Sequence, residues 1–369
     1  MAKTIYIHIG HYKTGTTALQ VFMNSNRDTL RELGTLWRKG VDYPEQFCDL
    51  AKHTKLAFSI YREAGVSTLL YGFQNEVPAK TRWAEFFEYV RNSKCPSVLI
   101  SSEEFMRMGA NPAACDIFKD IIAPVRNEFN FKIIAYLRRP DAHLRSWYNQ
   151  LVKLKQPVPD FNSTVCDLME PIHYDYSLAL KPWIELFGEK SVVVRPYTEA
   201  LRENGELFRD FLGILGIPFD GKNASRWDVP GNGINLRLED RFLELTRVAQ
   251  NVGMKPERVE LMRERFAKQL DAHQPREDRA TGFDQVVETA RGGLEALKTN
   301  PQTAGLATLY ADHLPDGDTA DRAEMLSLVQ MLLQENTVLR NRLNATSLEL
   351  KNRLSAIEDH LGISKPGSQ

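Results

Sequence analysis

The amino-acid sequence predicts an α/β fold of three layers, with a central and mainly parallel sheet, followed by a helical C-terminal extension. Short apolar runs rich in β-branched residues alternate with amphipathic stretches through the first two thirds of the chain. Continuous apolar strands are typical of parallel sheets that are buried on both faces. The repeat of strand, helix and strand implies right-handed crossovers and a sheet covered by helices.

The elements follow from these patterns in order. We expect helices where the amphipathic stretches lie, at 17–34, 81–93, 141–154 and 206–216. We expect strands where the apolar runs lie, at 4–10, 96–101, 131–137 and 191–197.

Composition narrows the class of protein. Lys+Arg 47 against Asp+Glu 48 leaves a formal net charge of -1, so no global basic field predicts nucleic acid as a partner. The four cysteines form no CxxC pair, so we expect reduced thiols, no metal cluster and a cytoplasmic location. The first strand begins directly after the start and no apolar run approaches about 18 residues, so we expect no leader and no transmembrane segment.

The chain is predicted to contain three parts: an α/β core over 1–240, a helical segment over 241–315 that packs on or caps the core, and a long helix over 320–361. Residues 218–237 are rich in Gly, Asn, Pro and Asp and predict a long loop. The cluster LPDGD at 314–318 precedes a stretch that carries no Gly or Pro.

The long helix contains a heptad pattern. One core position holds Val329, Asn336, Leu343, Leu350 and Ile357, and the other holds Leu332, Leu339, Thr346 and Arg353. An Asn at a core position fixes register in two-stranded coils, so the pattern favours a homodimer through this helix. An amphipathic helix packed on its own domain is the alternative.

A phosphate loop is predicted at the end of the first strand. IHIGHYKTGTTALQ at 7–20 passes from strand through a Gly-containing turn into a helix, which directs backbone N–H groups at an anion. Gly10 and Gly15 have the spacing of a Walker A loop, but Thr16 stands where a nucleotide triphosphatase has lysine. The lysine of this loop is Lys13. His8 and His11 flank the loop and are interpreted as packing or rim residues.

The run KTGTT between a strand and a helix resembles the 5′-phosphosulfate loop of the sulfotransferases, especially bacterial members that resemble carbohydrate sulfotransferases. That family has a P-loop-like fold and uses 3′-phosphoadenosine 5′-phosphosulfate without a metal. The resemblance implies that Lys13 holds the phosphosulfate and steadies the leaving oxygen, while Thr14, Gly15, Thr16 and Thr17 supply backbone and hydroxyl donors.

A second motif lies in IIAYLRRPDAHLRSWYNQ at 133–150. Arg138 and Ser146 match the arginine and serine of the family's 3′-phosphate motif, and Arg139 and Arg145 are interpreted as solvated charges. Tyr197 in VVVRPYTEAL matches the position that presents an aromatic ring to the adenine. The family's late Arg-Lys-Gly turn has no literal counterpart, and the candidates that replace it are Arg226, Trp227 and Arg237.

The catalytic base is expected after the strand at 96–101, in SVLISSEEF. Glu103 is the predicted base, with Glu104 and His53 left open. Two adjacent carboxylates would repel an anionic cofactor unless one turns outward or carries a proton.

These residues predict transfer of a sulfuryl group to a hydroxyl or amine. The resemblance favours a glycan or glycolipid acceptor, with peripheral contact to a glycolipid. Candidates for a sugar or phenol site are the aromatic residues Trp37, Tyr43, Phe47, Trp147 and Tyr148, although aromatic residues in such stripes more often belong to the core. One alternative is a P-loop kinase or NTPase, against which stand the displaced lysine and the lack of a clear magnesium-binding Asp after a later strand. The other alternative is a non-catalytic coiled-coil scaffold with a vestigial nucleotide site.

Overall fold

The computed structural model of the protein describes residues 2–36, 40–66, 77–154, 158–219, 224–230, 240–255, 258–259, 282–317 and 320–361. The chain forms two compact units. The first contains Met1–Trp147, Val165–Leu236 and Gly282–Asp316, and the second contains Tyr148–Thr164, Arg237–Thr281 and Gly317–Gln369.

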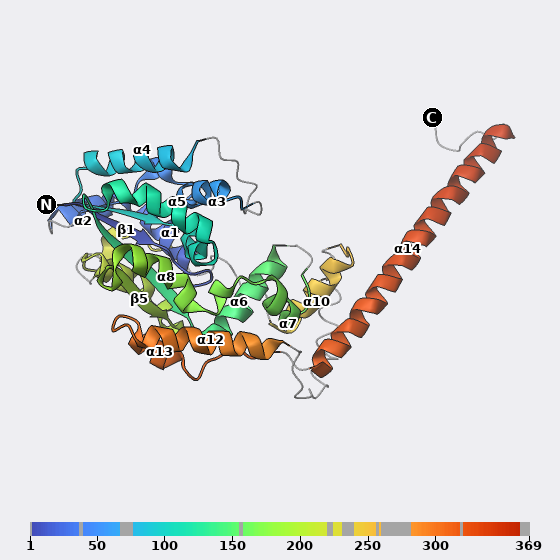
Figure 1. The fold of residues 1–369 in the computed structure, drawn as a ribbon. Helices are drawn as coiled ribbons and strands as arrows, with labels where there is room; N and C mark the ends of the chain where they lie inside the picture. Colours follow the sequence, from blue (N-terminus) through green and yellow to red (C-terminus); the bar gives the residue numbers. More distant parts are fainter. Residues whose placement is uncertain are drawn as a thin grey trace. The chain divides into compact units, whose positions relative to one another are not determined.

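A parallel sheet of five strands forms the centre of the first unit, in the order β2-β3-β1-β4-β5 (Figure 1). The strands are β1 Thr4–His8, β2 Val41–Asp42, β3 Ser97–Ser101, β4 Asn130–Arg138 and β5 Val192–Tyr197. The predicted parallel α/β fold is therefore confirmed. Among the described strands, the prediction lacks β2, whose two residues are too few to form a pattern.

Helices cover both faces of this sheet, because neighbouring residues of a buried strand point in opposite directions. In β4, Ile133 and Leu137 pack with α3, α4, α5 and α8, while Tyr136 packs on the other face with α1 and α9. The described helices of the unit are α1 Thr16–Ser25, α2 Arg27–Leu36, α3 Thr54–Glu63, α4 Ala79–Asn92, α5 Pro112–Ile122, α8 Tyr176–Phe187, α9 Glu206–Ile214, α12 Phe283–Lys298 and α13 Ala304–Tyr310. Helix α6 Pro140–Lys153 belongs to the first unit up to Trp147 and to the second from Tyr148.

The helix expected at 17–34 is divided into α1 and α2 at Asn26. The Asn26 amide donates to the carbonyls of Phe22 at 2.7 Å and Asp228 at 2.8 Å, and its oxygen accepts from the Asp228 N–H at 2.7 Å. Asn side chains that bond to nearby backbone groups compete with the helical ladder, which explains the break. The same bonds attach residues 224–230 to the end of α1.

The predicted helical segment contributes to both units. In the first unit, α12 packs on α8, and the Tyr310 hydroxyl of α13 donates to the Leu137 carbonyl of β4 at 2.7 Å (Figure 1). In the second unit, α10 Asp240–Asn251 contains a buried ion pair of 2.8 Å between Arg247 and Glu244. Residues 260–281 lie outside the described part of the chain.

The second unit also contains α7 Phe161–Ser163 and the long helix α14 Ala320–His360. Leu326 near the start of α14 packs on Leu245 of α10. None of the described helices has both the length and the apolar character that crossing a bilayer requires.

The order of the strands indicates where a ligand binds. The chain leaves β1 toward β3 on one side of the sheet and reaches β4 on the other side. In open parallel sheets, ligands bind beyond the carboxyl ends of the strands at such a reversal. The loop after β1, the residues after β3 and the ends of β4 and β5 all lie at this edge.

Candidate functional site

The loop after β1 has the backbone geometry of an anion site. Gly10, Lys13 and Gly15 have φ values of 58°, 64° and 75°, which lie in the left-handed region. Lys13 is a non-glycine residue in this region, a strained conformation that is concentrated at functional sites. Helix α1 begins after Gly15, and its first turn carries no acidic side chain. Its free N–H groups are thus available to an anion.

Thr14 braces this loop from within. Its hydroxyl donates to the His11 carbonyl at 2.6 Å and accepts from the His11 N–H at 3.2 Å, and its side chain is buried. The hydroxyl proton of Thr14 is therefore already engaged inside the loop, which leaves its backbone N–H as the donor for a ligand. Thr16 is buried below Gly10, and Thr17 is half-buried.

Gly10→Ala is expected to destabilise the protein by about 2 kcal/mol, because a β-carbon at this positive φ would lie 2.5 Å from Cγ2 of Thr16. Gly65→Ala is the matched control: its φ is +81°, and nothing lies within 4 Å of the added atom. Urea unfolding of both variants separates the backbone cost from the steric cost. Equal losses in the two variants would show that Thr16 accommodates the methyl group.

Glu103 lies against the start of the loop. Its Cα is 3.6 Å from the position of a β-carbon on Gly10. Gln20 donates to its Oε2 at 2.8 Å, and Lys52 donates to its Oε1 at 2.8 Å. Burial alone would raise the pKa of Glu103, but the charge and hydrogen bond of Lys52 and the bond from Gln20 lower it overall. Neither partner was predicted, because Gln20 was assigned no role at the end of the loop motif and Lys52 lies outside the motifs.

Glu104 is in a different electrostatic state from its neighbour. Burial and the charge of Glu103 raise the pKa of Glu104 to about 7, against the opposing effect of Arg107. Arg107 lies 3.7 Å from Glu104 and makes its shorter ion pair, 2.7 Å, with Glu170. The adjacent carboxyls therefore differ, with Glu103 ionised and Glu104 holding a proton over part of the neutral range.

Glu104→Gln is expected to change how stability depends on pH. The folded pKa is raised from 4.5 to about 7, so the stabilising contribution is fully present below pH 4.5 and is lost as the pH rises through 7. As the pH rises from 4.5 to 7, the free energy of unfolding of the wild type should fall by about 3 kcal/mol relative to that of Glu104→Gln. Unfolding free energies from pH 4.5 to 8 measure the difference, with Glu88→Gln on α4 as an exposed control. Parallel profiles for wild type and Glu104→Gln would contradict the raised pKa.

Both ring nitrogens of His53 are engaged by the backbone. Nδ1 accepts from the Ser101 N–H at 3.1 Å, and Nε2 lies 3.2 Å from the Pro44 carbonyl, to which it donates. The ring is fully buried, and this burial lowers the pKa of His53 to about 3. The His53 ring therefore has no free lone pair that could take a proton from an acceptor hydroxyl. This geometry favours a carboxylate over His53 as the base.

The residues of the predicted 3′-phosphate motif lie on adjoining elements. Arg138 is the last residue of β4, and Ser146 is buried in α6. The Arg138 guanidinium contacts Glu199 at 3.0 Å. Arg138 and Tyr197 border a cavity of about 320 Å³, and Ser146 is not among its lining residues. The lining residues are Arg138, Arg139, Ala142, Tyr197, Thr198, Glu199, Leu309, Tyr310 and His313.

Tyr197 connects the end of β5 to the phosphate loop. A β-carbon on Gly15 would lie 3.1 Å from Cε2 and 3.3 Å from the hydroxyl of Tyr197. The structure thus brings together the loop and a residue predicted to contact the adenine. By contrast, Arg139 pairs with Asp141 at 2.6 Å, and Arg145 donates to the Asp316 carbonyl at 3.1 Å, as expected of charges that serve the helix surface.

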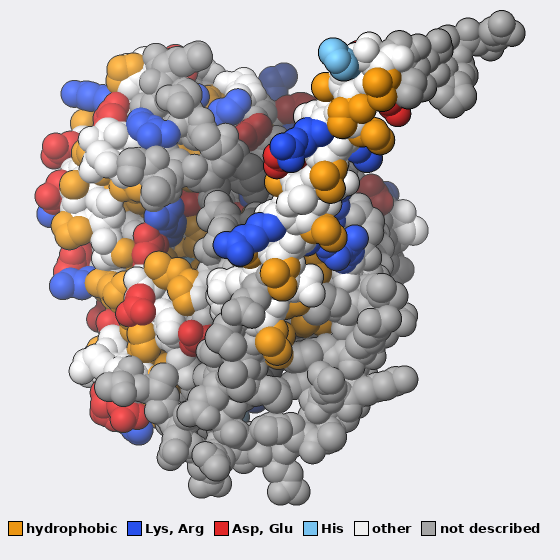
Figure 2. Space-filling model, turned by 90° about the vertical axis from the view of Figure 1, so that its right-hand side faces the viewer, with side chains coloured by type: hydrophobic (Ala, Val, Ile, Leu, Met, Phe, Trp, Pro, Cys, Tyr) orange, Lys and Arg blue, Asp and Glu red, His pale blue; other side chains and the backbone are white. Residues whose placement is uncertain are grey.

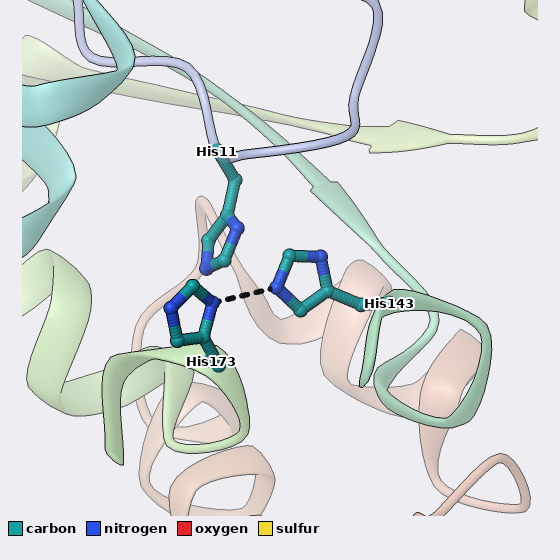
Figure 3. A group of neighbouring side chains, drawn as sticks. All are labelled: His11, His143 and His173. Carbon is teal, nitrogen blue, oxygen red and sulfur yellow. Dashed lines mark hydrogen bonds between the residues drawn. The ribbon is translucent and has the colours of Figure 1, made fainter. Parts of the chain in front are cut away.

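Three buried histidines meet beneath the loop (Figure 3). His11 comes from the loop, His143 from α6 and His173 from the turn at Pro171–His173. Nε2 of His143 and Nδ1 of His173 are 3.0 Å apart, and Nε2 of His11 lies 3.0 Å from the Ile172 carbonyl. Burial lowers the pKa of His143, and the charges of Arg138 and Lys13 lower it further. The loop, α6 and this turn are joined through neutral rings.

One ligand atom from each histidine lies within 4.8 Å of the others, a spacing that suits a metal ion. Among the described residues, this group contains no carboxylate or thiolate. The ring nitrogens are already engaged, because Nε2 of His11 faces the Ile172 carbonyl and Nε2 of His143 faces Nδ1 of His173. We therefore interpret the cluster as a hydrogen-bonded joint between the two predicted phosphate motifs. The cluster was not predicted, because no role was assigned to His143 within the second motif and His173 lies outside the motifs.

The remaining candidates are largely structural. Trp227 is buried against Phe22, with 5.4 Å between ring centroids, and the Arg226 carbonyl accepts from Thr29. Trp147 stacks on Tyr12 of the loop at 4.4 Å, which keeps it near the predicted site. The other described aromatics of the predicted acceptor site, Tyr43, Phe47 and Tyr148, are buried, while Trp37 and Arg237 lie outside the described residues.

Comparison with known proteins gives distant similarities. No protein-family model matches the chain. An uncharacterised protein of Archaeoglobus fulgidus is 29% identical over 163 residues, which is 43% of this chain and 40% of that protein. The chain therefore aligns with less than half of that relative. The crystal structure of a sulfotransferase from Alicyclobacillus acidocaldarius is similar with a TM-score of 0.39 and 16% identity, over 70% of this chain and 100% of that one.

Proposed function

We propose that the protein is a sulfotransferase that uses 3′-phosphoadenosine 5′-phosphosulfate as its donor. The observation that carries the proposal is that residues at the ends of two other strands of the sheet, β3 and β5, lie against the phosphate loop. Glu103 after β3 lies against Gly10, and Tyr197 of β5 lies against Gly15. His11, in the loop that holds Lys13, packs edge-on against His143 of α6, the helix that follows Arg138, with 4.0 Å between ring centroids.

In the proposed reaction, Glu103 accepts the proton of the acceptor hydroxyl while that oxygen attacks the sulfur. A new oxygen–sulfur bond forms as the bond from sulfur to the leaving phosphate oxygen breaks. Lys13 and the N–H groups at the start of α1 stabilise the negative charge that develops on this oxygen. Gln20 and Lys52 orient Glu103 and keep it ionised, and Lys52 must release Oε1 or share it when the proton arrives.

The first test is binding. Adenosine 3′,5′-bisphosphate should raise the melting temperature of the protein without added magnesium, and the rise should continue with the logarithm of its concentration above Kd. ATP with magnesium is the matched comparison for a P-loop kinase or NTPase. Stabilisation by ATP with magnesium but not by the bisphosphate would refute the proposed donor.

The second test is transfer of labelled sulfate, screened over glycan, glycolipid, phenol and peptide acceptors. We propose a glycan or glycolipid hydroxyl as the acceptor, with Trp147 beside the loop as one wall of its site. Tight bisphosphate binding with no transfer to any acceptor would instead favour a scaffold with a vestigial nucleotide site.

A further inference from the structure

The exposed part of α14 carries a narrow apolar stripe that none of the described residues covers. Its leucine and isoleucine side chains are 55% to 70% exposed, whereas buried core residues fall below one tenth. Hydrophobic side chains follow the helix between Lys and Arg side chains (Figure 2). The members of the stripe are Leu332, Leu339, Leu343, Leu350, Leu354, Ile357 and Leu361.

The apolar side chains of the stripe stay on one side of the helix over a longer stretch than a strict heptad frame suggests. At about 100° per residue, the positions from Leu332 to Leu361 fall within roughly 40° on either side of Leu350. A strict heptad continues three residues after Leu350 and places Arg353 in the seam. If the next seam residue instead comes four residues after Leu350, it is Leu354. Such a step is a stutter, which locally unwinds a coiled coil without ending it. The apolar seam therefore continues to Leu361 rather than decaying after Leu350.

The width of the stripe indicates the kind of partner. A helix that packs on a globular core or lies on a membrane shows a wider apolar face, whereas a stripe this narrow fits a coiled-coil seam. The stripe is also about 45 Å long, which is enough for four heptads.

The helix also requires a partner for its own stability. Isolated helices depend on tertiary packing or on a ladder of ion pairs. In the described residues beyond Val338, α14 has an ion pair between Arg353 and Glu349 at 4.0 Å, which is too weak to replace packing. Burial of the leucine stripe supplies the missing stabilisation.

We propose that the stripe pairs with the same stripe of a second copy, in parallel and in register. Two polar residues lie in the seam, Asn336 and Thr346. In the parallel pair each faces its own counterpart, and an Asn facing an Asn fixes register in two-stranded coils. An antiparallel pair that matches Asn336 to Thr346 sets Leu354 and Leu361 against the first turns of α14, where Leu326 already packs on Leu245.

The test is the mass of the full chain by analytical ultracentrifugation. The wild type should be a dimer at micromolar concentration, and Leu343→Asp with Leu350→Asp should weaken the dimer by at least about 100-fold. Leu348→Asp is the matched control, because Leu348 is 61% exposed but lies roughly 160° from Leu350 around the helix. A monomeric wild type, or equal effects of the double variant and the control, would overturn the proposal.

Orientation is tested by Thr346→Cys. Under oxidation this variant should form a covalent dimer that the wild type, with its four native cysteines, does not form. Failure to cross-link a dimeric variant would overturn parallel pairing. Thermal unfolding and far-ultraviolet circular dichroism of the Asp variants would show whether the first unit remains folded, so the result does not depend on the proposed transferase activity.

Discussion

Lys13→Ala is expected to lower turnover by about 100- to 1,000-fold while bisphosphate affinity changes by less than about tenfold. Lys13 is assigned to the leaving oxygen, where negative charge develops as the sulfuryl group departs. A preorganised donor at such an atom contributes mainly to the transition state, and its removal costs turnover in this range. Single-turnover transfer rates and calorimetric binding of adenosine 3′,5′-bisphosphate measure the two quantities separately.

Two further variants separate the effect of the charge at position 13 from the effect of side-chain length. Lys13→Arg keeps the charge in the loop and should retain part of the turnover, while Lys13→Gln keeps much of the length without the charge and should resemble alanine. Since Lys13 has a φ of 64°, thermal unfolding must show that all three variants remain folded. A large loss of affinity with unchanged turnover would assign Lys13 to cofactor binding alone.

Arg138→Ala is expected to weaken bisphosphate binding by about 10- to 100-fold with a smaller change in turnover at saturation. Hydrogen bonds to a charged group contribute about 1.5–3 kcal/mol, and tenfold in affinity corresponds to about 1.4 kcal/mol. Arg138 is the last residue of β4, and its ion pair with Glu199 must open or be shared when a phosphate binds. Titration calorimetry gives the affinity directly.

Arg139→Ala is the matched control for this prediction. Arg139 is the next residue, borders the same cavity and pairs with Asp141. Its loss removes one positive charge without removing the predicted phosphate contact, so affinity should fall by less than about threefold in 0.15 M salt. Equal losses in the two variants would indicate that general charge, rather than a contact from Arg138, supports binding.

The fold and the loop could be predicted because their signals are local. Buried parallel strands appear as continuous apolar runs, and the loop after β1 is marked by Gly10, Lys13 and Gly15. The structure confirms the α/β fold and the helical extension. The roles assigned to the site residues and the coiled coil remain predictions.

Other features depend on contacts between segments far apart in the sequence. Lys52 meets Glu103 where the chain after β2 lies beside the end of β3, and His173 reaches His143 across thirty residues. The break at Asn26 depends on Asp228, more than two hundred residues away. Neither periodicity nor motif spacing in the sequence indicates contacts between such distant segments. These parts of the site were therefore not predicted.

The histidine joint connects the two segments to which the two phosphates of the proposed cofactor are assigned. His11 belongs to the loop of Lys13, and His143 lies in the helix that follows Arg138. A double-mutant cycle between Lys13 and Arg138 should therefore show a non-zero coupling energy, although each side chain is assigned to a different end of the cofactor. A substitution at His143, which is assigned to neither phosphate, would then loosen the hold on both.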